Sequence, residues 1–474
     1  MRDKYKFLGK NIFYLLISSF STKLLSFFLV PLYTNVLSTE EYGSYDFLAT
    51  TVSLLIPILT VEIAAAVFIF AIDENYNRKE VLSVAIRYLI GSSAIVFLFL
   101  VVNEIFQFIP IVSQYREFFL LMYIVNASSG IFMEFTRAMG NMLNMSIASA
   151  LCSFCIIICN ILFLLVFEWG LEGYFLANIV GGLVQIFFLI IKGNLLSGIS
   201  IRINYATVQK EMTKYSAPLI SNSVAWWINS ASDRYVVVGF CGLAENGVYS
   251  VASKIPSILN IVQTVFNQAW GVSVIKEFDP DDKEGFFTRT YNVYNLLLIT
   301  VCSCIIAGNR ILANLLYAKD FYPAWKYVPF LTMAIIFGSL SGFIGGFFSA
   351  MKKSSILAKS TMVGAIINFI LNLIMVPFIG ALGAAIATVI SYWLVWMFRT
   401  IHVRKNVNIK FRLVRDHIGY LLLVVQTAVT LIVQKDSLML WIFHLCILVL
   451  LFLLNKSEVI EMWEFVRKKI FKNK

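Results

Sequence analysis

The sequence predicts an all-α polytopic membrane protein of about fourteen transmembrane helices: two six-helix lobes related by a parallel repeat, plus two C-terminal helices. Three observations lead to this prediction. Apolar residues make up 59% of the 474 positions and charged residues only 14%, apolar runs of roughly 20 residues recur, and two parts of the chain repeat each other. A soluble protein of this length needs a largely polar surface. A transmembrane barrel would show alternating polarity, which is not sustained here.

The expected spans follow apolar runs from Asn11 to Leu454, each long enough to cross ~30 Å of hydrocarbon as a helix. The first six are 11–33, 45–70, 82–102, 117–137, 146–167 and 173–191. The other eight are 216–238, 248–275, 290–307, 327–350, 360–378, 384–398, 417–434 and 438–454. The predicted divisions are an N-lobe at 1–192, a cytoplasmic linker at 193–215, a C-lobe at 216–398, and two helices with a basic tail at 399–474.

Basic residues set the predicted orientation. With both termini in the cytoplasm, cytoplasmic segments carry 29 of the 38 Lys and Arg residues and exterior loops carry five, as the positive-inside rule requires. The net charge of +11 is therefore mainly an orientation signal, and no nucleic-acid partner is predicted. We expect a multi-pass protein of the bacterial cytoplasmic membrane.

The remaining composition points away from covalent chemistry. The seven cysteines lie in or beside apolar spans, so they predict neither a disulfide framework nor a metal site. The linker at 193–215 is too short for a catalytic domain. The sequence thus predicts a protein that is not an enzyme and has no cofactor.

An internal repeat relates the two halves. Glu41–Tyr45 reads EYGSY and Glu245–Tyr249 reads ENGVY, 204 residues later. An Ala-Met pair follows the fourth span of each half, beginning at Ala138 and Ala350, and glycine turns at 170–173 and 380–383 correspond. Two parallel six-helix repeats enclosing a cavity are the expected geometry for alternating access, so transport is the predicted class.

Two lysines lie deep inside predicted spans. Lys23 is near the middle of the first span, and Lys254 is roughly 10 Å into the eighth at 1.5 Å per residue. Ser257 flanks Lys254 on the same helical face. A charge at midspan costs at least ~2.5 kcal/mol, so we expect both lysines to face a polar cavity and bind substrate.

The seventh span carries two polar stripes, one with Asn229 and Asp233 and the other with Arg234. We expect Asn229 and Arg234 to contact substrate and Asp233 to take part in ion coupling; a salt bridge at the rim is the alternative. Glu62 has no cation at helical spacing on its own span, which favours an ion-coupling carboxylate; pairing with Lys23 or another cation on a neighbouring helix is the alternative. The excess of deep cations suits an anionic substrate.

Several segments together resemble the Wzx-type oligosaccharide flippases, the polysaccharide transporter group of the multidrug/oligosaccharidyl-lipid/polysaccharide (MOP) exporter superfamily. The segments, in order along nearly the whole chain, are Leu37–Tyr45, Ser232–Tyr235, Asn246–Pro256, Phe266–Trp270 and Leu316–Ala324.

The resemblance implies a substrate, an undecaprenyl-diphosphate-linked oligosaccharide repeat unit, moved to the outer leaflet for capsule, exopolysaccharide or O-antigen synthesis. It also implies a two-lobed cavity, and a groove for the lipid tail formed with the last two helices. Membrane lipid surrounds the protein, and a polysaccharide polymerase is a possible protein partner. The chain is expected to be a monomer. A drug exporter or lipid II flippase of the same superfamily is the nearest alternative; a membrane glycosyltransferase or polymerase, which needs a large exterior loop, fits less well.

The distribution of basic residues gives a first test. Reporter fusions at Lys474 and Gly380 should give cytoplasmic and exterior signals, respectively, because Lys474 ends a basic tail and Gly380 lies in an uncharged turn. An exterior signal at Lys474 would refute the fourteen-span topology.

Overall fold

The computed structural model describes residues 27–195, 205–351, 353–433, 435–460 and 463, and this part of the chain contains helices and no strands. It confirms the predicted all-α class. The chain divides into two compact units, Met1–Gly247 and Val248–Lys474, each of which is described by itself.

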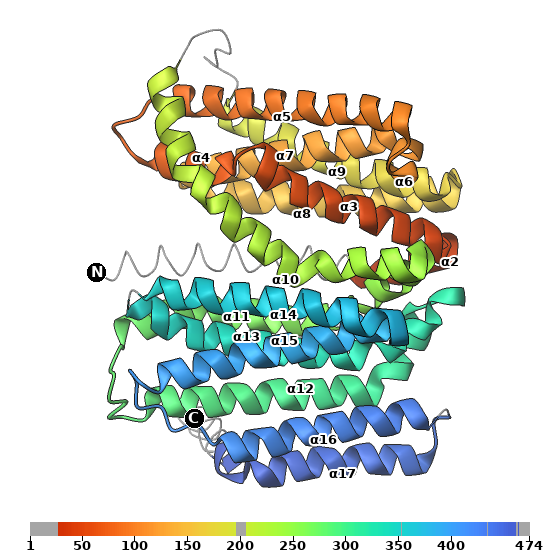
Figure 1. Cartoon of the computed structure of the whole chain (residues 1–474), viewed down its shortest axis with the longest axis vertical. Helices are drawn as coiled ribbons and strands as arrows, with labels where there is room; N and C mark the ends of the chain where they lie inside the picture. Colours follow the sequence, from red (N-terminus) through yellow and green to blue (C-terminus); the bar gives the residue numbers. More distant parts are fainter. Residues whose placement is uncertain (1–26, 196–204, 352, 434, 461–462, 464–474) are drawn as a thin grey trace, which may run out of the picture. The chain divides into compact units, whose positions relative to one another are not determined.

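The first unit consists of long helices joined by several short ones (Figure 1). They are α2 (Val30–Val36), α3 (Thr39–Leu59), α4 (Ile63–Ile72), α5 (Arg78–Phe106), α6 (Pro110–Gln114), α7 (Arg116–Ala138), α8 (Met142–Asn160) with the π-helical turn η1 (Ile161–Val166), α9 (Gly170–Gly193) and most of α10 (Ala206–Ala252). Helix α7 lies at the centre and packs against α3, α4, α5 and α9.

The second unit is built around α13. Its helices are α11 (Ser257–Lys276), α12 (Phe286–Leu316), the 3-10 turn η2 (Lys319–Lys326), α13 (Val328–Ala350), α14 (Ser354–Ile379), α15 (Ala381–Val403), α16 (Leu413–Ile432) and α17 (Leu438–Leu454). Helix α13 contacts α11, α12 and α15, and the α16–α17 hairpin packs on α12 (Figure 1).

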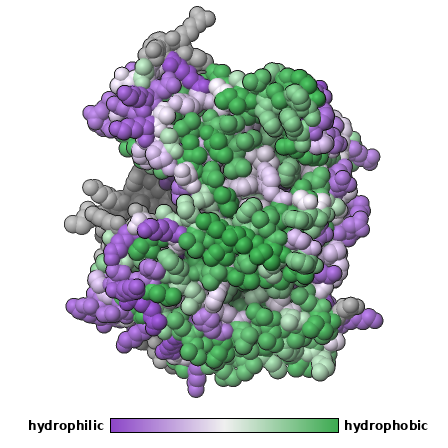
Figure 2. Space-filling model, in the orientation of Figure 1, coloured by the Kyte–Doolittle hydropathy of each residue, from purple (hydrophilic) through white to green (hydrophobic). Residues whose placement is uncertain are grey.

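Ten of the described helices are long and apolar enough to cross a membrane. In each unit, apolar residues cover the middle of the face in Figure 2 and polar residues gather near the helix ends. Large apolar side chains such as Phe97, Leu98 and Ile105 are more than half exposed, which is expected where lipid is the solvent. The first predicted span lies largely outside the described residues.

Two predicted spans are not continuous helices. The span at 45–70 breaks between α3 and α4, after Pro57, and the span at 248–275 breaks between α10 and α11, before Pro256. The proline ring disfavours helical geometry in the preceding residue, which accounts for the break before Pro256; Pro57 itself lies inside α3, and the first break follows it at Val61 and Glu62. Both spans were predicted from their apolar composition, which does not reveal breaks in a helix.

The internal repeat is visible in the ends of the helices. Helices α7 and α13 each have 23 residues and end at the Ala of an Ala-Met pair. The turns that start α9 and α15 each contain a glycine with positive φ, Gly170 at 54° and Gly380 at 62°. The boundary of the compact units at Gly247 nevertheless groups most of α10 with the first unit. Compact packing places a boundary after Gly247, whereas the internal repeat predicts one before α10. The predicted lobe boundaries therefore stay a prediction.

The two glycines of the repeated EYG/ENG motif meet where α3 crosses α10. A side chain on Gly43 would overlap the carbonyl oxygen of Leu243, and one on Gly247 would overlap that of Thr39. The contact is reciprocal, because Thr39 and Leu243 are themselves 204 residues apart. The Asn246 amide donates to the Gly43 carbonyl at 3.1 Å. Small residues let helix backbones approach this closely inside a membrane.

This crossing predicts a specific sensitivity to size. Gly43→Ala should lower stability by about 2 kcal/mol, the usual cost of overpacking, and reduce the thermal unfolding temperature of the purified protein. Gly239→Ala is the matched control, because open space surrounds Gly239 on α10; it should be neutral or stabilising by up to about 1 kcal/mol. Equal unfolding temperatures for the two variants would contradict the tight crossing.

Candidate functional site

Glu62 lies at the break between α3 and α4, in a conformation that non-glycine residues seldom adopt. Val61 and Glu62 have φ of 56° and 51°, which costs of order 1–3 kcal/mol per residue, and a β-branched residue such as Val61 is rare there. The Glu62 amide donates to the Pro57 carbonyl at 2.9 Å rather than continuing the α-helical pattern. Strained, broken helices of this kind often form transporter binding sites.

The Glu62 side chain is half-buried. The Ser223 hydroxyl on α10 hydrogen-bonds to its carboxyl group, and no cation forms a salt bridge with it among the residues that the structure describes. The carboxylate therefore lies between α4 and α10 with a neutral partner. Lys23, the alternative partner, lies outside the described residues, so the coupling role of Glu62 stays a prediction.

Arg234 forms an ion pair that the sequence analysis considered only in general terms. Its Nε lies 2.7 Å from Oδ2 of Asp46 on α3, and both side chains are less than one-fifth exposed. The Asn246 amide lies 3.4 Å from the same Asp46 oxygen. Most of the Arg234 charge is thus neutralised within the protein, which makes it a weaker candidate for substrate binding than a cation without a carboxylate partner.

On the side of α10 that carries Arg234, two aromatic side chains reach α3, whereas Ser230 is exposed. The Trp227 indole donates to the Thr50 carbonyl and the Ser53 hydroxyl, each at 3.1 Å, and the hydroxyls of Tyr235 and Thr51 are 2.5 Å apart. These polar side chains therefore join two helices.

The other stripe of α10 is mixed. Asn229 and Asp233 are buried, at 7% and 8% exposure, whereas Trp226 is 53% exposed. The Asp233 carboxylate accepts a hydrogen bond from the Arg234 backbone amide at 2.9 Å. Asn229 and Asp233 are thus enclosed in the first unit, and their roles in binding and coupling stay predictions.

In the second unit, Lys254 lies in the turn between α10 and α11 rather than in a continuous helix. Its side chain is half-buried, and no carboxylate pairs with it in the described part of this unit. The Ser257 hydroxyl donates to the Lys254 carbonyl at 2.5 Å, so Ser257 satisfies backbone freed by the break. Lys23, the other predicted ligand, lies outside the described residues.

Two arginines that the sequence analysis overlooked as individual sites are buried in the second unit. Arg399, counted with the basic cytoplasmic segment, is inside α15 and 6% exposed. It donates to the Ser360 and Thr361 hydroxyls and to the Ser341 carbonyl at 2.9–3.0 Å, and so joins α13, α14 and α15. In the sequence, only Ser391, eight residues earlier on the same helical face, indicated a polar surrounding for Arg399. Arg310 on α12 pairs with Asp436 at 3.3 Å and lies over the Trp325 ring.

A cluster of charges holds the α16–α17 hairpin. Arg415 contacts Asp416 at 2.9 Å and Glu458 at 2.5 Å, and both carboxylates are nearly buried. Burial alone would raise the pKa of Glu458, but the Ser457 hydroxyl and Arg415 bring that pKa below its usual value. Arg415 also donates to Asn292 of α12 at 2.8 Å. These basic residues, interpreted from the sequence as an orientation signal, also have a structural role.

An apolar pocket of about 270 Å³ opens between α13, α15 and α16. Three residues in its lining have side chains that can form hydrogen bonds: Trp393, His417 and Tyr420. The Trp393 indole nitrogen lies 3.3 Å from the His417 ring. The other lining residues are Met333, Ile336, Phe337, Val389, Ile390, Leu421, Leu423 and Val424. The pocket could hold a hydrocarbon chain that enters from the membrane.

Broken apolar helices with charged side chains at the breaks are typical of membrane transporters, and the chain is a multi-pass membrane protein. Residues 8–271 match the family model described as "Polysaccharide biosynthesis protein", and the chain belongs to that family. Family and fold point to a transporter rather than an enzyme.

Two curated relatives match parts of the chain. The "Probable low-salt glycan biosynthesis flippase Agl15" of Haloferax volcanii is 22% identical over 43% of this chain and 44% of its own length. The "Uncharacterized membrane protein MJ1068" of Methanocaldococcus jannaschii is 24% identical over 25% of this chain and 24% of its own. The chain thus spans less than half the length of each relative in these alignments.

Solved structures show the fold. The lipid II flippase MurJ, in an inward closed conformation, has a TM-score of 0.70 and 16% identity, covering 96% of this chain and 99% of MurJ. An inward-facing MATE family multidrug transporter of the MOP superfamily has a TM-score of 0.61 and 14% identity, covering 83% and 94%. The family match and the flippase relative, together with this shared fold, confirm the resemblance inferred from the sequence.

The enclosed ion pair gives a prediction for the first unit. Asp46→Asn and Arg234→Gln should each lower stability by about 1–3 kcal/mol, because each leaves a partly buried charge without its partner. The double variant should lose less stability than the sum of the losses in the two single variants.

Thermal unfolding of the two single variants and the double variant measures this coupling. Glu134→Gln is the control, since Glu134 pairs with Arg137 one helical turn away and is one-third exposed; it should change stability by less than about 0.5 kcal/mol. Additive effects at Asp46 and Arg234 would show that the pair contributes nothing.

Proposed function

We propose that this protein is a flippase that moves undecaprenyl-diphosphate-linked oligosaccharide repeat units from the inner to the outer leaflet of a bacterial cytoplasmic membrane, for capsule, exopolysaccharide or O-antigen synthesis. The family match over residues 8–271 carries the proposal. The relative named as a glycan biosynthesis flippase and the fold shared with MOP-superfamily transporters support it. Alternating access is the proposed mechanism.

The distribution of charge supports an anionic cargo. A diphosphate carries about two negative charges and would gain roughly 4.6 kcal/mol on leaving an interior held 100 mV negative, at ~2.3 kcal/mol per charge. Lys254 is the leading diphosphate ligand, because no carboxylate in the described part of its unit neutralises it. Lys23 is proposed as a second ligand from its sequence position. Arg234, Asn229 and Ser257 have a lesser role, since each already has a partner within the protein.

Glu62 is the proposed coupling group. Its carboxyl lies at a helix break with a neutral hydroxyl partner, so gaining or losing a proton would not require breaking a salt bridge. Asp233 is the second candidate, and it is more enclosed. Either would allow proton or sodium antiport in addition to the membrane potential.

The pocket between α13, α15 and α16 is the proposed binding place of part of the isoprenoid tail. Its lining is almost wholly apolar, as a hydrocarbon chain requires. Helix α16 belongs to the pair of helices outside the repeat, in agreement with the groove that the resemblance implied. We expect the flippase to act as a monomer, with a polysaccharide polymerase as the candidate partner.

A lipid II flippase is the second candidate, favoured by the TM-score of 0.70 to MurJ over nearly both whole chains. Deletion of the gene separates the two functions. Loss of surface polysaccharide with lipid-linked repeat units accumulating inside supports our proposal, whereas arrest of cell-wall synthesis with intact surface polysaccharide supports lipid II.

Replacing the lysines tests the mechanism. Lys23→Gln and Lys254→Gln should each lower polysaccharide export at least about tenfold, because a hydrogen bond to a charged group contributes ~1.5–3 kcal/mol. Arginine at either position should retain part of the export, since it keeps the charge. Export is measured in the deletion strain, normalised to the amount of each variant in the membrane.

Lys359→Gln is the control, because Lys359 is exposed on α14 of the same unit, and it should export normally. Normal export by well-expressed Lys23→Met and Lys254→Met variants would refute the cationic mechanism and leave these lysines structural. Normal export by Glu62→Gln would exclude coupling at Glu62.

A further inference from the structure

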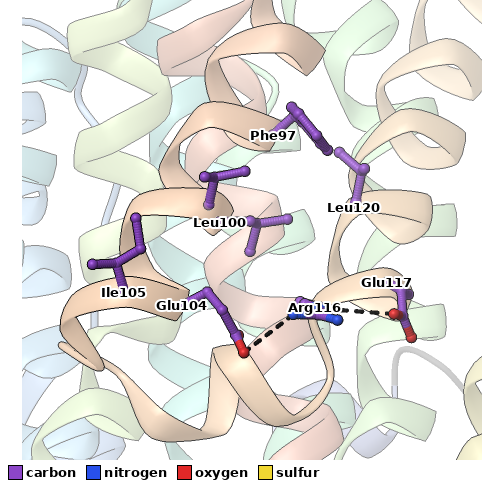
Figure 3. A pocket seen from close by; sticks show the side chains of 8 residues that line it. Phe97, Leu100, Glu104, Ile105, Arg116, Glu117 and Leu120 are labelled. Carbon is purple, nitrogen blue, oxygen red and sulfur yellow. Dashed lines mark ion pairs between the residues drawn. The ribbon is translucent and has the colours of Figure 1, made fainter.

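A pocket of about 470 Å³ lies on the side of the first unit, between α5 and α7 (Figure 3). Three charged side chains form one end of it, Glu104, Arg116 and Glu117, and the rest of the lining is apolar. The apolar members are Phe97, Leu100, Val101, Ile105 and Leu120. This polarity resembles that of a lipid, with one charged end and one hydrocarbon end.

The charged end is an ion-pair triad at the turn between the two helices. Nη1 of Arg116 lies 3.2 Å from Glu104, and Nε lies 3.5 Å from Glu117; Figure 3 shows the guanidinium between the two carboxylates. The three side chains are 45–77% exposed, so they remain open to a further ligand. With one cation and two anions, the triad has a net charge of −1.

The turn that carries the triad is rigidly built. The fully buried Asn103 amide donates to the Ile109 carbonyl at 3.1 Å and to the Ser113 hydroxyl at 2.8 Å, and its oxygen accepts from the Ile109 amide at 2.9 Å. Phe106 and Phe108 stack beside it at 5.4 Å between ring centres, with most of their surface exposed. Charged side chains at the ends of membrane helices lie where they can reach water, so the triad marks the level of the membrane interface.

The apolar part descends from that level into the hydrocarbon. Phe97 lies seven residues before Glu104 on α5, about 10 Å deeper at 1.5 Å per residue, and Leu120 lies one turn deeper than Arg116 on α7. Because both helices are membrane spans whose outer faces meet lipid, the occupant of this pocket comes from the bilayer.

We propose that the pocket binds a phospholipid with a primary-amine head group, of the phosphatidylethanolamine class. One acyl chain fills the apolar part, Arg116 binds the phosphate, and Glu104 and Glu117 accept hydrogen bonds from the ammonium. Charge complementarity favours this class over an anionic lipid, whose head group would meet a net negative triad. A trimethylated amine keeps the positive charge but donates no such hydrogen bonds, so it should bind less well. The site lies within the first unit and is independent of the proposed cargo.

The test uses the full-length protein in nanodiscs with equal amounts of phosphatidylethanolamine, phosphatidylcholine and phosphatidylglycerol of matched acyl chains. Lipid retained after transfer to mild detergent is counted by native mass spectrometry. The wild type should retain phosphatidylethanolamine over phosphatidylglycerol by about fivefold, with phosphatidylcholine between them, as expected for accessible charge pairs.

Two variants separate head-group recognition from chain binding. Glu104→Gln with Glu117→Gln should abolish the preference, whereas Leu120→Trp, which fills the apolar part, should lower retention of all three lipids. Glu74→Gln removes an equally exposed carboxylate in the loop after α4 and should leave the preference unchanged.

No preference in the wild type would overturn the proposal, and this result needs no variant. A preference that survives the double Glu104/Glu117 substitution, or that Glu74→Gln reduces equally, would also overturn it.

Discussion

The need to satisfy backbone polar groups without water governs this fold. In hydrocarbon, an amide or carbonyl without a hydrogen bond costs several kcal/mol, so a chain with this composition forms long helices and departs from them only where other groups replace the lost bonds. The described part of each unit contains a helix break within a predicted span. At the first, Glu62 bonds back to Pro57, and at the second, the Ser257 hydroxyl bonds to the Lys254 carbonyl. The two ionisable residues of greatest functional interest thus occupy the places where the backbone is least regular.

Much of the fold could be predicted because hydropathy and membrane thickness determine where helices lie. The expected span at 327–350 and α13 at Val328–Ala350 differ by one residue, and the Ala-Met ends of two helices agree with the repeat. Hydropathy averages over about 20 residues, however, and cannot detect a break of three or four. Proline alone does not identify such breaks either, because Pro218 and Pro377 lie inside α10 and α14.

The candidate site was less predictable, because partners between helices depend on tertiary packing. Helical spacing correctly put Arg234 on a polar stripe, but only the structure shows Asp46 opposite it. Arg399 illustrates the opposite error: a basic residue at the end of an apolar run was interpreted as a loop residue, yet neutral oxygens of three helices surround it. A buried cation is least costly when all its donors have acceptors, and sequence spacing within one helix does not reveal acceptors on others.

The contact between Gly43 and Gly247 also constrains how the protein is made. Helix α3 cannot complete its packing until the end of α10 has been synthesised, about 200 residues later. At ~5–20 residues per second, the ribosome needs roughly 10–40 s to reach that point. During this interval the groove of α3 around Gly43 lacks its native occupant inside the bilayer, where another small-residue helix could bind it. The newly inserted first unit is therefore an incomplete intermediate, and the second copy of the motif provides the helix that completes it.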